Sequence, residues 1–181
     1  MPSGSASDPY LAEPHRRWAR SYADALKEGL HPQQASEEDI YFAANDLEQY
    51  MQRRHDMSRP VVLPDGRTVP RMPQTDLWLI KDDIFLGMAS LRPQLNDVLQ
   101  QRGGNIGYAV RESQRKKGYG RLILTLALPR LKELNLSQAL VTCHDKNTAS
   151  IRIIESCGGV LENKVRIPGL DVPERRYWIA L

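Results

Sequence analysis

The sequence is short of the features that mark secreted, membrane-spanning and strongly nucleic-acid-binding proteins. It has only two cysteines, Cys143 and Cys157, and two free thiols in a reducing compartment are a simpler interpretation than one disulfide. No run approaches the roughly 20 apolar residues of a membrane span, and the first eight residues carry no hydrophobic signal core. The formal net charge of +3 predicts no dominant attraction to nucleic acid or membrane. These absences lead us to expect a cytoplasmic protein.

Metal-site spacings, internal repeats and low-complexity blocks are also missing. The four histidines show no ligand spacing with one another or with the cysteines, so we predict no metal; they are His15, His31, His55 and His144. With 181 residues, 41% of them hydrophobic and 26% charged, the chain has the size and composition of an ordinary globular protein. We expect a disordered tip over residues 1–9 and a single domain over residues 10–181.

The first third of the chain is predicted to be mainly helical. Apolar residues recur at roughly helical spacing over residues 10–29, and a second helix is expected over residues 36–55, with acidic residues in its first turn. Residues 61–63 and 68–69 flank the turn Pro64-Asp65-Gly66, which predicts a short hairpin.

The rest of the chain alternates strands with helices. Alternating apolar residues and turn signals predict strands over residues 77–80, 84–91, 106–110, 139–143, 160–165 and 176–181. A short helix is expected within residues 92–102, and longer ones over 122–136 and 148–157. Pro129 lacks a backbone donor and is expected to kink or split the first of these longer helices. The pattern predicts an α/β fold.

A basic, glycine-containing loop connects the strand at 106–110 to the following helix. It reads Arg115-Lys116-Lys117-Gly118-Tyr119-Gly120, followed by Arg121. Its glycines let backbone N–H groups approach phosphate oxygens, and the helix N-terminus adds partial positive charge. A basic turn on a solvated surface is the alternative interpretation of this loop alone. It lacks the Ser or Thr of a P-loop and the third glycine of a Rossmann loop.

Two elements taken together resemble the GNAT superfamily of N-acetyltransferases. The loop at residues 115–120 matches the superfamily pattern Arg/Gln-x-x-Gly-x-Gly/Ala, and the helix start at residues 147–150, Asn-Thr-Ala-Ser, matches Asn-x-x-Ser/Ala. The segment IRIIESCGG at 151–159 continues the second match, so the resemblance runs over residues 77–162. Residues 104–108 and 175–178 are similar to a bacterial subgroup of GNAT proteins to which we attach no substrate.

The resemblance implies a fold, a cosubstrate and a set of binding residues. The fold would be a GNAT-like α/β fold, with a central mixed, mostly antiparallel sheet splayed at the cofactor and helices on both faces. The cosubstrate would be acetyl-CoA, whose pantetheine arm would pair with the backbone of Ala109 and Val110 and contact Asn147 and Ser150. Its pyrophosphate would be bound by Arg115, Lys116, Lys117, Gly118, Tyr119, Gly120 and Arg121. Asn147 could equally serve as a helix cap.

The resemblance also implies direct attack of a primary amine, on a small molecule or peptide, on the thioester, with a base for the ammonium and an acid for the thiolate. Many members supply the acid from a Tyr four residues after the Ser or Ala of the second element, but Ile154 stands there. We select His144 as the leading catalytic candidate, with an exposed histidine or one bonded to Asp145 as the alternative. Tyr108 and Tyr177 are further catalytic candidates, and both also suit packing.

Residues 77–165 would form the acetyl-CoA-binding core, and the helical segment at 10–60 would wall the acceptor site. An alternative function is a non-catalytic module that senses acyl-CoA, since the usual Tyr is missing. Covalent transfer through Cys143 is less favoured, because a thiol in an apolar strand usually only packs. An edge strand near the C-terminus could pair with a second copy and form a homodimer.

Overall fold

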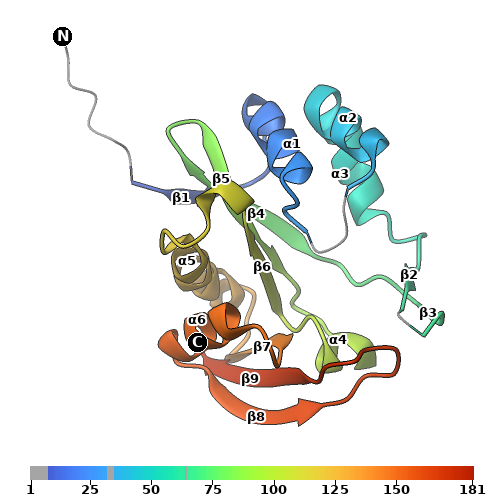
Figure 1. Ribbon diagram of the computed structural model, residues 1–181, viewed down its shortest axis with the longest axis vertical. Helices are drawn as coiled ribbons and strands as arrows, with labels where there is room; N and C mark the ends of the chain where they lie inside the picture. The colour runs from blue at the N-terminus through green and yellow to red at the C-terminus, as the bar shows by residue number, and fades with distance from the viewer. Residues whose placement is uncertain (1–7, 32–34, 64) are drawn as a thin grey trace.

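The computed structural model describes residues 8–31, 35–63 and 65–181 (Figure 1). Most of the tip expected at residues 1–9 and Pro64 of the expected hairpin turn lie outside these residues. Two antiparallel sheets and one hairpin contain the described strands. The first sheet has the order β1 (Tyr10–Ala12), β4 (Thr75–Lys81), β5 (Ile84–Leu91) and β6 (Ile106–Val110). The second has the order β7 (Gln138–His144), β9 (Glu174–Ala180) and β8 (Val160–Val165), and the hairpin pairs β2 (Val61–Val62) with β3 (Thr68–Val69).

The two sheets are joined at one end of their facing edge strands, β6 and β7. The backbone N–H of Asn105 donates to Leu140 O at 2.8 Å, and the Leu140 N–H donates to the Asn105 side-chain oxygen at 2.8 Å. Gly104 has φ +62° and lies so close that a Cβ would be 2.2 Å from Leu140 O, so only glycine fits there. Beyond this junction β6 and β7 form no ladder with each other. This confirms the predicted mostly antiparallel sheet that splays open, and every described strand pairing is antiparallel.

Helices cover both faces of the sheets (Figure 1). One face of the sheets packs on α5 (Tyr119–Glu133) and α6 (Thr148–Ser156), and we call it the α5 face. Its core includes Leu79, Ile123, Val141 and Tyr177. The opposite face of the first sheet packs on α1 (Ala19–Lys27), α2 (Glu37–Asn45) and α3 (Leu47–His55), with Tyr22, Trp78, Phe85 and Met88 in its core. Alternation along the strands divides the apolar residues between these two cores.

Two N-terminal predictions were wrong in detail. Residues 10–12 form strand β1 instead of the first turns of a helix, because they pair with the exposed edge of β4. The helical chain begins only after Pro14, with a 3₁₀ turn (Arg16–Trp18) leading into α1. The helix expected over 36–55 is two helices, since Asp46 leaves the helical conformation and caps α3 by accepting from the Gln49 N–H at 3.0 Å.

The remaining elements follow the sequence closely. The short helix α4 (Asp97–Gln101) lies within the predicted segment, and β4 to β6 form as expected. Helix α5 begins at Tyr119, three residues earlier than predicted, so it follows the glycine of the basic loop directly. Pro129 does not split it, and this residue lies on the exposed side of the helix, where a missing backbone bond can be replaced by water.

Candidate functional site

The basic loop between β6 and α5 presents a row of unpartnered backbone donors. Lys116 has φ +62° and Gly118 has φ +84°, and left-handed residues so close together turn successive N–H groups toward one side. Within the described chain, the N–H groups of residues 116–121 donate no hydrogen bond. They include the first donors of α5, where the helix dipole adds partial positive charge. This geometry suits a phosphate or another multiply charged anion.

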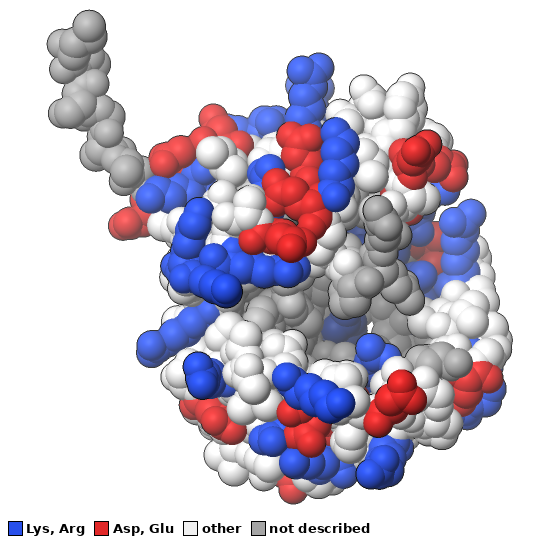
Figure 2. Space-filling model, in the orientation of Figure 1, with Lys and Arg blue, Asp and Glu red and all other residues white. Residues whose placement is uncertain are grey.

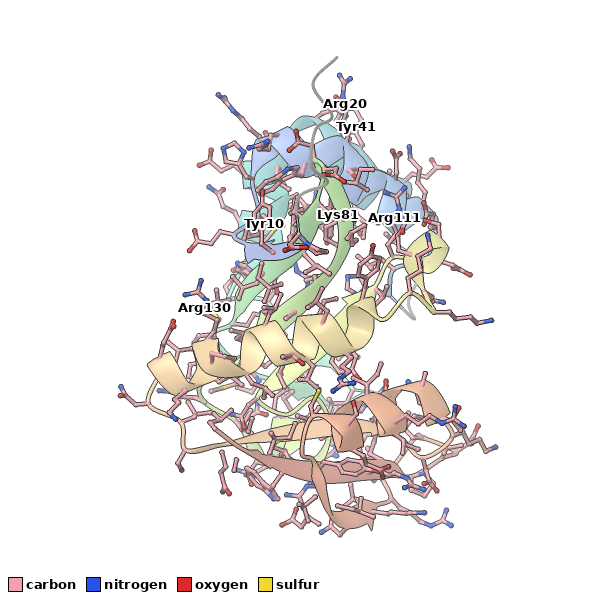
Figure 3. The ribbon with its side chains drawn as sticks, turned by 90° about the vertical axis from the view of Figure 1, so that its left-hand side faces the viewer. Tyr10, Arg20, Tyr41, Lys81, Arg111 and Arg130 are labelled. Atoms are coloured by element: carbon pink, nitrogen blue, oxygen red, sulfur yellow. The ribbon has the colours of Figure 1, made fainter. Side chains whose placement is uncertain are left out.

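The C-terminal end of α1 holds this loop in place. Glu28 Oε1 accepts from two guanidinium nitrogens of Arg111, at 2.6 and 2.8 Å, while Oε2 accepts from the Ser113 N–H and hydroxyl. Figure 3 shows Arg111 beside the end of α1. The Arg111 guanidinium is the main reason that the pKa of Glu28 falls to about 2. Sequence analysis missed this pair, whose members are 83 residues apart.

The side chains of the loop divide into free and engaged groups. Lys116, Lys117 and Arg121 are exposed, and the Lys117 ammonium donates to the Gln114 side chain. Arg115 instead folds back, with Nη2 directed at Gly29 O and Nε at Val110 O, both at 3.4 Å. On the face seen in Figure 2, Lys and Arg atoms lie on several sides of the central hollow, with Asp and Glu atoms between them. The exposed cations of the loop follow or flank its free N–H donors in the sequence.

The glycine at position 120 serves packing more than phosphate approach. A Cβ there would lie 2.8 Å from Ile153 Cδ1 and 3.8 Å from Tyr108 Cε2. Gly120 therefore lets the first turn of α5 lie against α6 and β6, and the backbone freedom argued from the sequence belongs to Gly118, where a Cβ would meet open space but φ is positive. Tyr119 contributes its N–H to the row, and its half-buried ring packs on the α5-face core.

Strand β6, which leads into the loop, has one free edge. Ala109 and Val110 pair with Met88 and Gly87 of β5, so their other edge faces the gap between the sheets. Since no described strand pairs with that edge beyond Asn105, an extended ligand could add to it as a further strand. The free edge starts where the row of loop donors ends.

The N-terminus of α6 lies across this gap. The Asn147 side-chain oxygen accepts from the Ser150 N–H at 3.1 Å, so its capping role is present, and the exposed amide nitrogen remains available. The Ser150 side chain lies close to the phenol of Tyr108. The structure thus brings Asn147, Ser150, Tyr108 and the basic loop together on the α5 face.

Tyr108 places an unpartnered hydroxyl in this gap. The oxygen is buried and accepts or donates no hydrogen bond within the described chain. Burial raises the pKa of Tyr108 to about 12, and the nearby Ser150 side chain only partly opposes this shift. Ile154, which occupies the position of the usual family Tyr, is fully buried in the core. Tyr108 is therefore a phenol with a free hydroxyl on the face where Ile154 replaces the usual Tyr.

His144 lies on the opposite face of its sheet, directly across from Glu174 in the β7–β9 ladder. Glu174 is only 3% exposed, with one oxygen 3.4 Å from Arg102 Nε, and burial raises its pKa above the ordinary value. Asp145 bonds to Arg175 and Lys164, not to His144. Sequence analysis missed Glu174, which stands in a strand otherwise rich in Arg and aromatic residues.

The third catalytic candidate, Tyr177, is separated from His144 by the sheet. Its buried hydroxyl donates to Glu155 Oε1 at 3.1 Å and accepts from Arg175 Nη1 at 3.2 Å on the α5 face. Cys143 lies on that face as well, and burial raises the pKa of its thiol to about 11, which opposes thiolate formation at neutral pH. Both side chains pack and hold α6 against the sheet.

Three further observations concern metal binding, cavities and membrane spans. In the described ranges no group of three or more His, Cys, Asp or Glu side chains could hold a metal ion. A cavity of about 890 Å³ lies between the β2–β3 hairpin, α4 and the loop before β9, and its wall includes Gly103 and Arg102. No helix within the described residues is long and apolar enough to span a membrane.

The site thus combines an anion-binding helix N-terminus, a free strand edge leading from it and two sheets that part at that edge. These parts fit the class of acyltransferases. The family model of the acetyltransferase (GNAT) domain matches residues 16–160, so the chain belongs to this family of acetyltransferases. The match includes the N-terminal helices, which lie outside the resemblance at 77–162.

Solved acetyltransferase structures share this fold along almost their whole length. The ribosomal-protein-S5-alanine acetyltransferase from Vibrio fischeri is 12% identical with a TM-score of 0.64, covering 97% of this chain and 96% of its own. The structure of yncA from Salmonella typhimurium, solved with its cofactor acetyl-CoA, is 14% identical with a TM-score of 0.61, covering 97% of this chain and 95% of its own. The spermidine/spermine N-acetyltransferase SpeG from Vibrio cholerae is 16% identical with a TM-score of 0.60, covering 96% of this chain and 95% of its own. No curated protein sequence matches the chain.

Proposed function

We propose that the protein transfers an acetyl group from acetyl-CoA to a primary amine by direct attack. The observation that carries the proposal is the continuous path from the free N–H groups of residues 116–121 to the free edge of β6. Pyrophosphate would bind the N–H groups, with Lys116, Lys117 and Arg121 neutralising its charge. Arg115 would act mainly by holding the loop, since its guanidinium points back to Gly29 and Val110.

The pantetheine arm would extend along β6 as an added strand. Its amide groups would bond the backbone of Val110 and Ala109 on one side. On the other side the free amide nitrogen of Asn147 and the hydroxyl of Ser150 would face it. An arm running down this edge brings the thioester beside Gly107 and Tyr108, at the place where the two sheets part.

The catalytic groups would act from the two faces of the sheets. His144, opposite the buried Glu174, would take the proton of the attacking ammonium on the opposite face. The amine nitrogen bonds the acetyl carbon, the bond from that carbon to sulfur breaks, and the second proton of the nitrogen passes to the departing sulfur to give the free thiol. Tyr108, whose raised pKa keeps it protonated at neutral pH, would donate a hydrogen bond to the departing thiolate from the α5 face. Tyr177 has its hydroxyl already engaged and would only pack.

The helices of residues 10–60 would wall the acceptor side. Helices α1 to α3 cover the face of the first sheet opposite α5. His144 and Glu174 lie on the corresponding face of the second sheet, also opposite the α5 face. The acceptor would therefore enter between these helices and β7, at the hollow visible in Figure 2. A single domain over residues 10–181, a cytoplasmic location and a homodimer through an edge strand stay predictions.

One observation favours a second function, that of a non-catalytic acyl-CoA sensor. The position of the usual family acid is the buried apolar Ile154. A sensor would bind the thioester without transferring its acyl group.

The test is calorimetric titration with acetyl-CoA and with CoA, followed by a thiol-release screen over amines and peptide N-termini. Micromolar binding together with thiol release in the presence of one amine class would support the enzyme. Binding without release from any amine would favour the sensor. Absence of binding to a folded protein would contradict the assignment of the phosphate loop.

A further inference from the structure

Arg92 places a guanidinium at the point where the proposed thioester and the acceptor meet. It follows β5, and its Nη1 and Nη2 lie 3.5 and 3.6 Å from where a Cβ of Gly107 would be. Gly107 pairs with Ser90, whose hydroxyl bonds Asp76 beneath α3, so Arg92 lies on the same face as His144. The absence of a side chain at Gly107 leaves this stretch of β6 open to the guanidinium.

The guanidinium is fixed but not neutralised. Its Nε donates to the Gln74 side-chain oxygen at 3.2 Å, and its Nη1 donates to Gly104 O at 3.3 Å. Across the described chain Arg92 forms no ion pair, and its Nη2 donates no hydrogen bond. Burial lowers its pKa from the ordinary value, as expected for a cation held away from water without an anion.

The nearest acidic group is already saturated. Asp76 is fully buried, and its two oxygens accept from Ser90, Gln74, Arg54 and His55. Arg54 alone balances its charge, so the guanidinium of Arg92 leaves an excess of positive charge on this face. A buried cation without a partner is costly unless an anion arrives to pair with it.

The missing anion is not the coenzyme A pyrophosphate. The phosphate loop follows Val110, whereas Gly107 lies three residues back along β6, or roughly 10 Å at the rise of an extended strand. The loop donors and Tyr108 also belong to the α5 face, whereas Arg92 belongs to the opposite face. An anion at Arg92 would therefore belong to the acceptor.

We propose that the acceptor is a free α-amino acid, whose carboxylate pairs with Arg92 while its amine faces the thioester and His144. This proposal rests on the proposed function. A guanidinium presents two donors side by side in the geometry of a carboxylate, and Arg92 has its Nη2 free. In an α-amino acid the amine and carboxylate are two bonds apart, which fits a binding group beside the reacting atoms. The cavity with Gly103 in its wall lies near the guanidinium, since the Gly103 carbonyl oxygen is 3.5 Å from Arg92 Nη1, and the side chain of the amino acid would extend toward it.

The charge excess also argues against other amine classes. A polyamine such as the spermidine of the SpeG name would place several positive charges against Arg92. The N-terminus of a protein carries no carboxylate beside its amine, so Arg92 would remain unpaired. The proposed acceptor therefore differs from the spermidine of the SpeG name and from the protein of the ribosomal-protein-S5-alanine acetyltransferase name.

The first arm of the test uses the unaltered protein and acetyl-CoA. Thiol release is measured with the twenty amino acids, with their α-amides and with spermidine. We expect kcat/KM for the best amino acid to exceed that of its own amide by about 10- to 100-fold, the scale of one charge-assisted pair. An amide as good as its acid, or spermidine as the best acceptor, would overturn the proposal while leaving acetyl transfer intact. Failure to bind acetyl-CoA would instead overturn the proposed function.

The second arm uses variants. Arg92→Gln should raise KM for the amino acid and lower its kcat/KM by about 10- to 100-fold, while kcat/KM for the amide stays the same. Arg92→Lys should recover part of the loss, because it keeps the charge without the fork. Arg130→Gln is the control, since Arg130 pairs with Glu133 on the exposed surface of α5. Figure 3 shows it at the other end of this helix from Arg111 and the phosphate loop. Equal losses for acid and amide would mean that Arg92 only supports the fold, and the first arm decides even if Arg92→Gln does not fold.

Discussion

At the scale of single residues, the two tyrosines that are candidates for catalysis have opposite surroundings. The Tyr108 hydroxyl is buried without a partner, whereas the Tyr177 hydroxyl bonds Glu155 and Arg175. An unmade hydrogen bond in a buried place weakens the fold, and proteins retain such a group mainly where a ligand completes it. Under the proposed function, the sulfur of coenzyme A would complete this hydrogen bond at Tyr108.

Exchange of each tyrosine for phenylalanine should therefore have opposite consequences. Tyr108→Phe should lower kcat by about 10²-fold with the affinity for acetyl-CoA kept, and should leave the free energy of unfolding unchanged or slightly raised. Tyr177→Phe should keep kcat and lower the free energy of unfolding by roughly 1 kcal/mol. Steady-state rates, calorimetry and denaturant unfolding measure these quantities. If Tyr177→Phe were the inactive variant, Tyr177 and not Tyr108 would be the acid.

His144 and Glu174 should act as one unit. Because they face each other across the β7–β9 ladder, loss of either should remove most of what both provide. We expect His144→Ala and Glu174→Gln each to lower kcat by about 10²-fold or more, and the double variant to be scarcely slower than the poorer single one. Rates at saturating acetyl-CoA complete the double-mutant cycle. Strictly additive losses would show that the two groups act separately.

The phosphate loop could be predicted from the sequence because all of its parts are local. Residues 115–121 contain the basic charge, the left-handed glycine and the helix start within one short segment. Glu174 and Arg92 could not be predicted, since each gains its meaning from a residue brought near by pairing of strands. A buried carboxylate opposite a histidine is visible only after the register of two distant strands is known.

At the scale of elements, helix α1 acts as a support for the phosphate loop. Glu28 and Gly29 at its end bind Arg111, Ser113 and Arg115. The same α1 was predicted from apolar spacing, but nothing in that spacing indicated the loop as its partner. Strand β1 was missed for a similar reason, because its three residues are set by the free edge of β4 rather than by their own pattern.

Removal of this support should weaken cofactor binding. Glu28→Ala should raise the Kd for acetyl-CoA by about 10-fold and lower the free energy of unfolding by roughly 1–2 kcal/mol, since Arg111 loses its only ion pair in the described chain. Asp24→Ala is the matched control on the same helix, where an exposed pair with Lys27 contributes little. Calorimetry and denaturant unfolding give both values. An unchanged Kd in Glu28→Ala would mean that the loop keeps its shape without α1.

At the scale of the whole molecule, the resemblance implied a splayed sheet, but the pattern of apolar residues alone indicated only the strands and the class of fold. Apolar alternation placed β4, β5, β6, β7 and β9 correctly, because such a pattern reports burial on each face. The junction at Asn105 depends on a side chain replacing a backbone partner of Leu140, which no periodicity records. The two sheets are joined at this contact and part beyond it, where the proposed site lies.

The stability of the whole fold should depend on pH through His31. Its Nε2 is buried without a partner in the described chain, and burial, with a smaller effect of Arg54, lowers its pKa to about 4. The folded state therefore favours neutral His31, and the unfolded chain, with a pKa near ~6.5, binds the proton first as pH falls. Its contribution is fully present above pH ~6.5 and is lost as pH falls toward 4.

Denaturant unfolding at pH 7 and pH 5 measures this contribution. Linkage gives a loss of about 2 kcal/mol from His31 between pH 7 and pH 5. The decrease in the free energy of unfolding over this interval should therefore be about 2 kcal/mol smaller in His31→Gln than in the unaltered protein. Asp76 and Glu28, whose pKa values are lowered in the fold, lose their contributions only at lower pH, where unfolded carboxylates begin to bind protons. Equal losses in the unaltered protein and in His31→Gln would mean that His31 gains water when the protein is in solution.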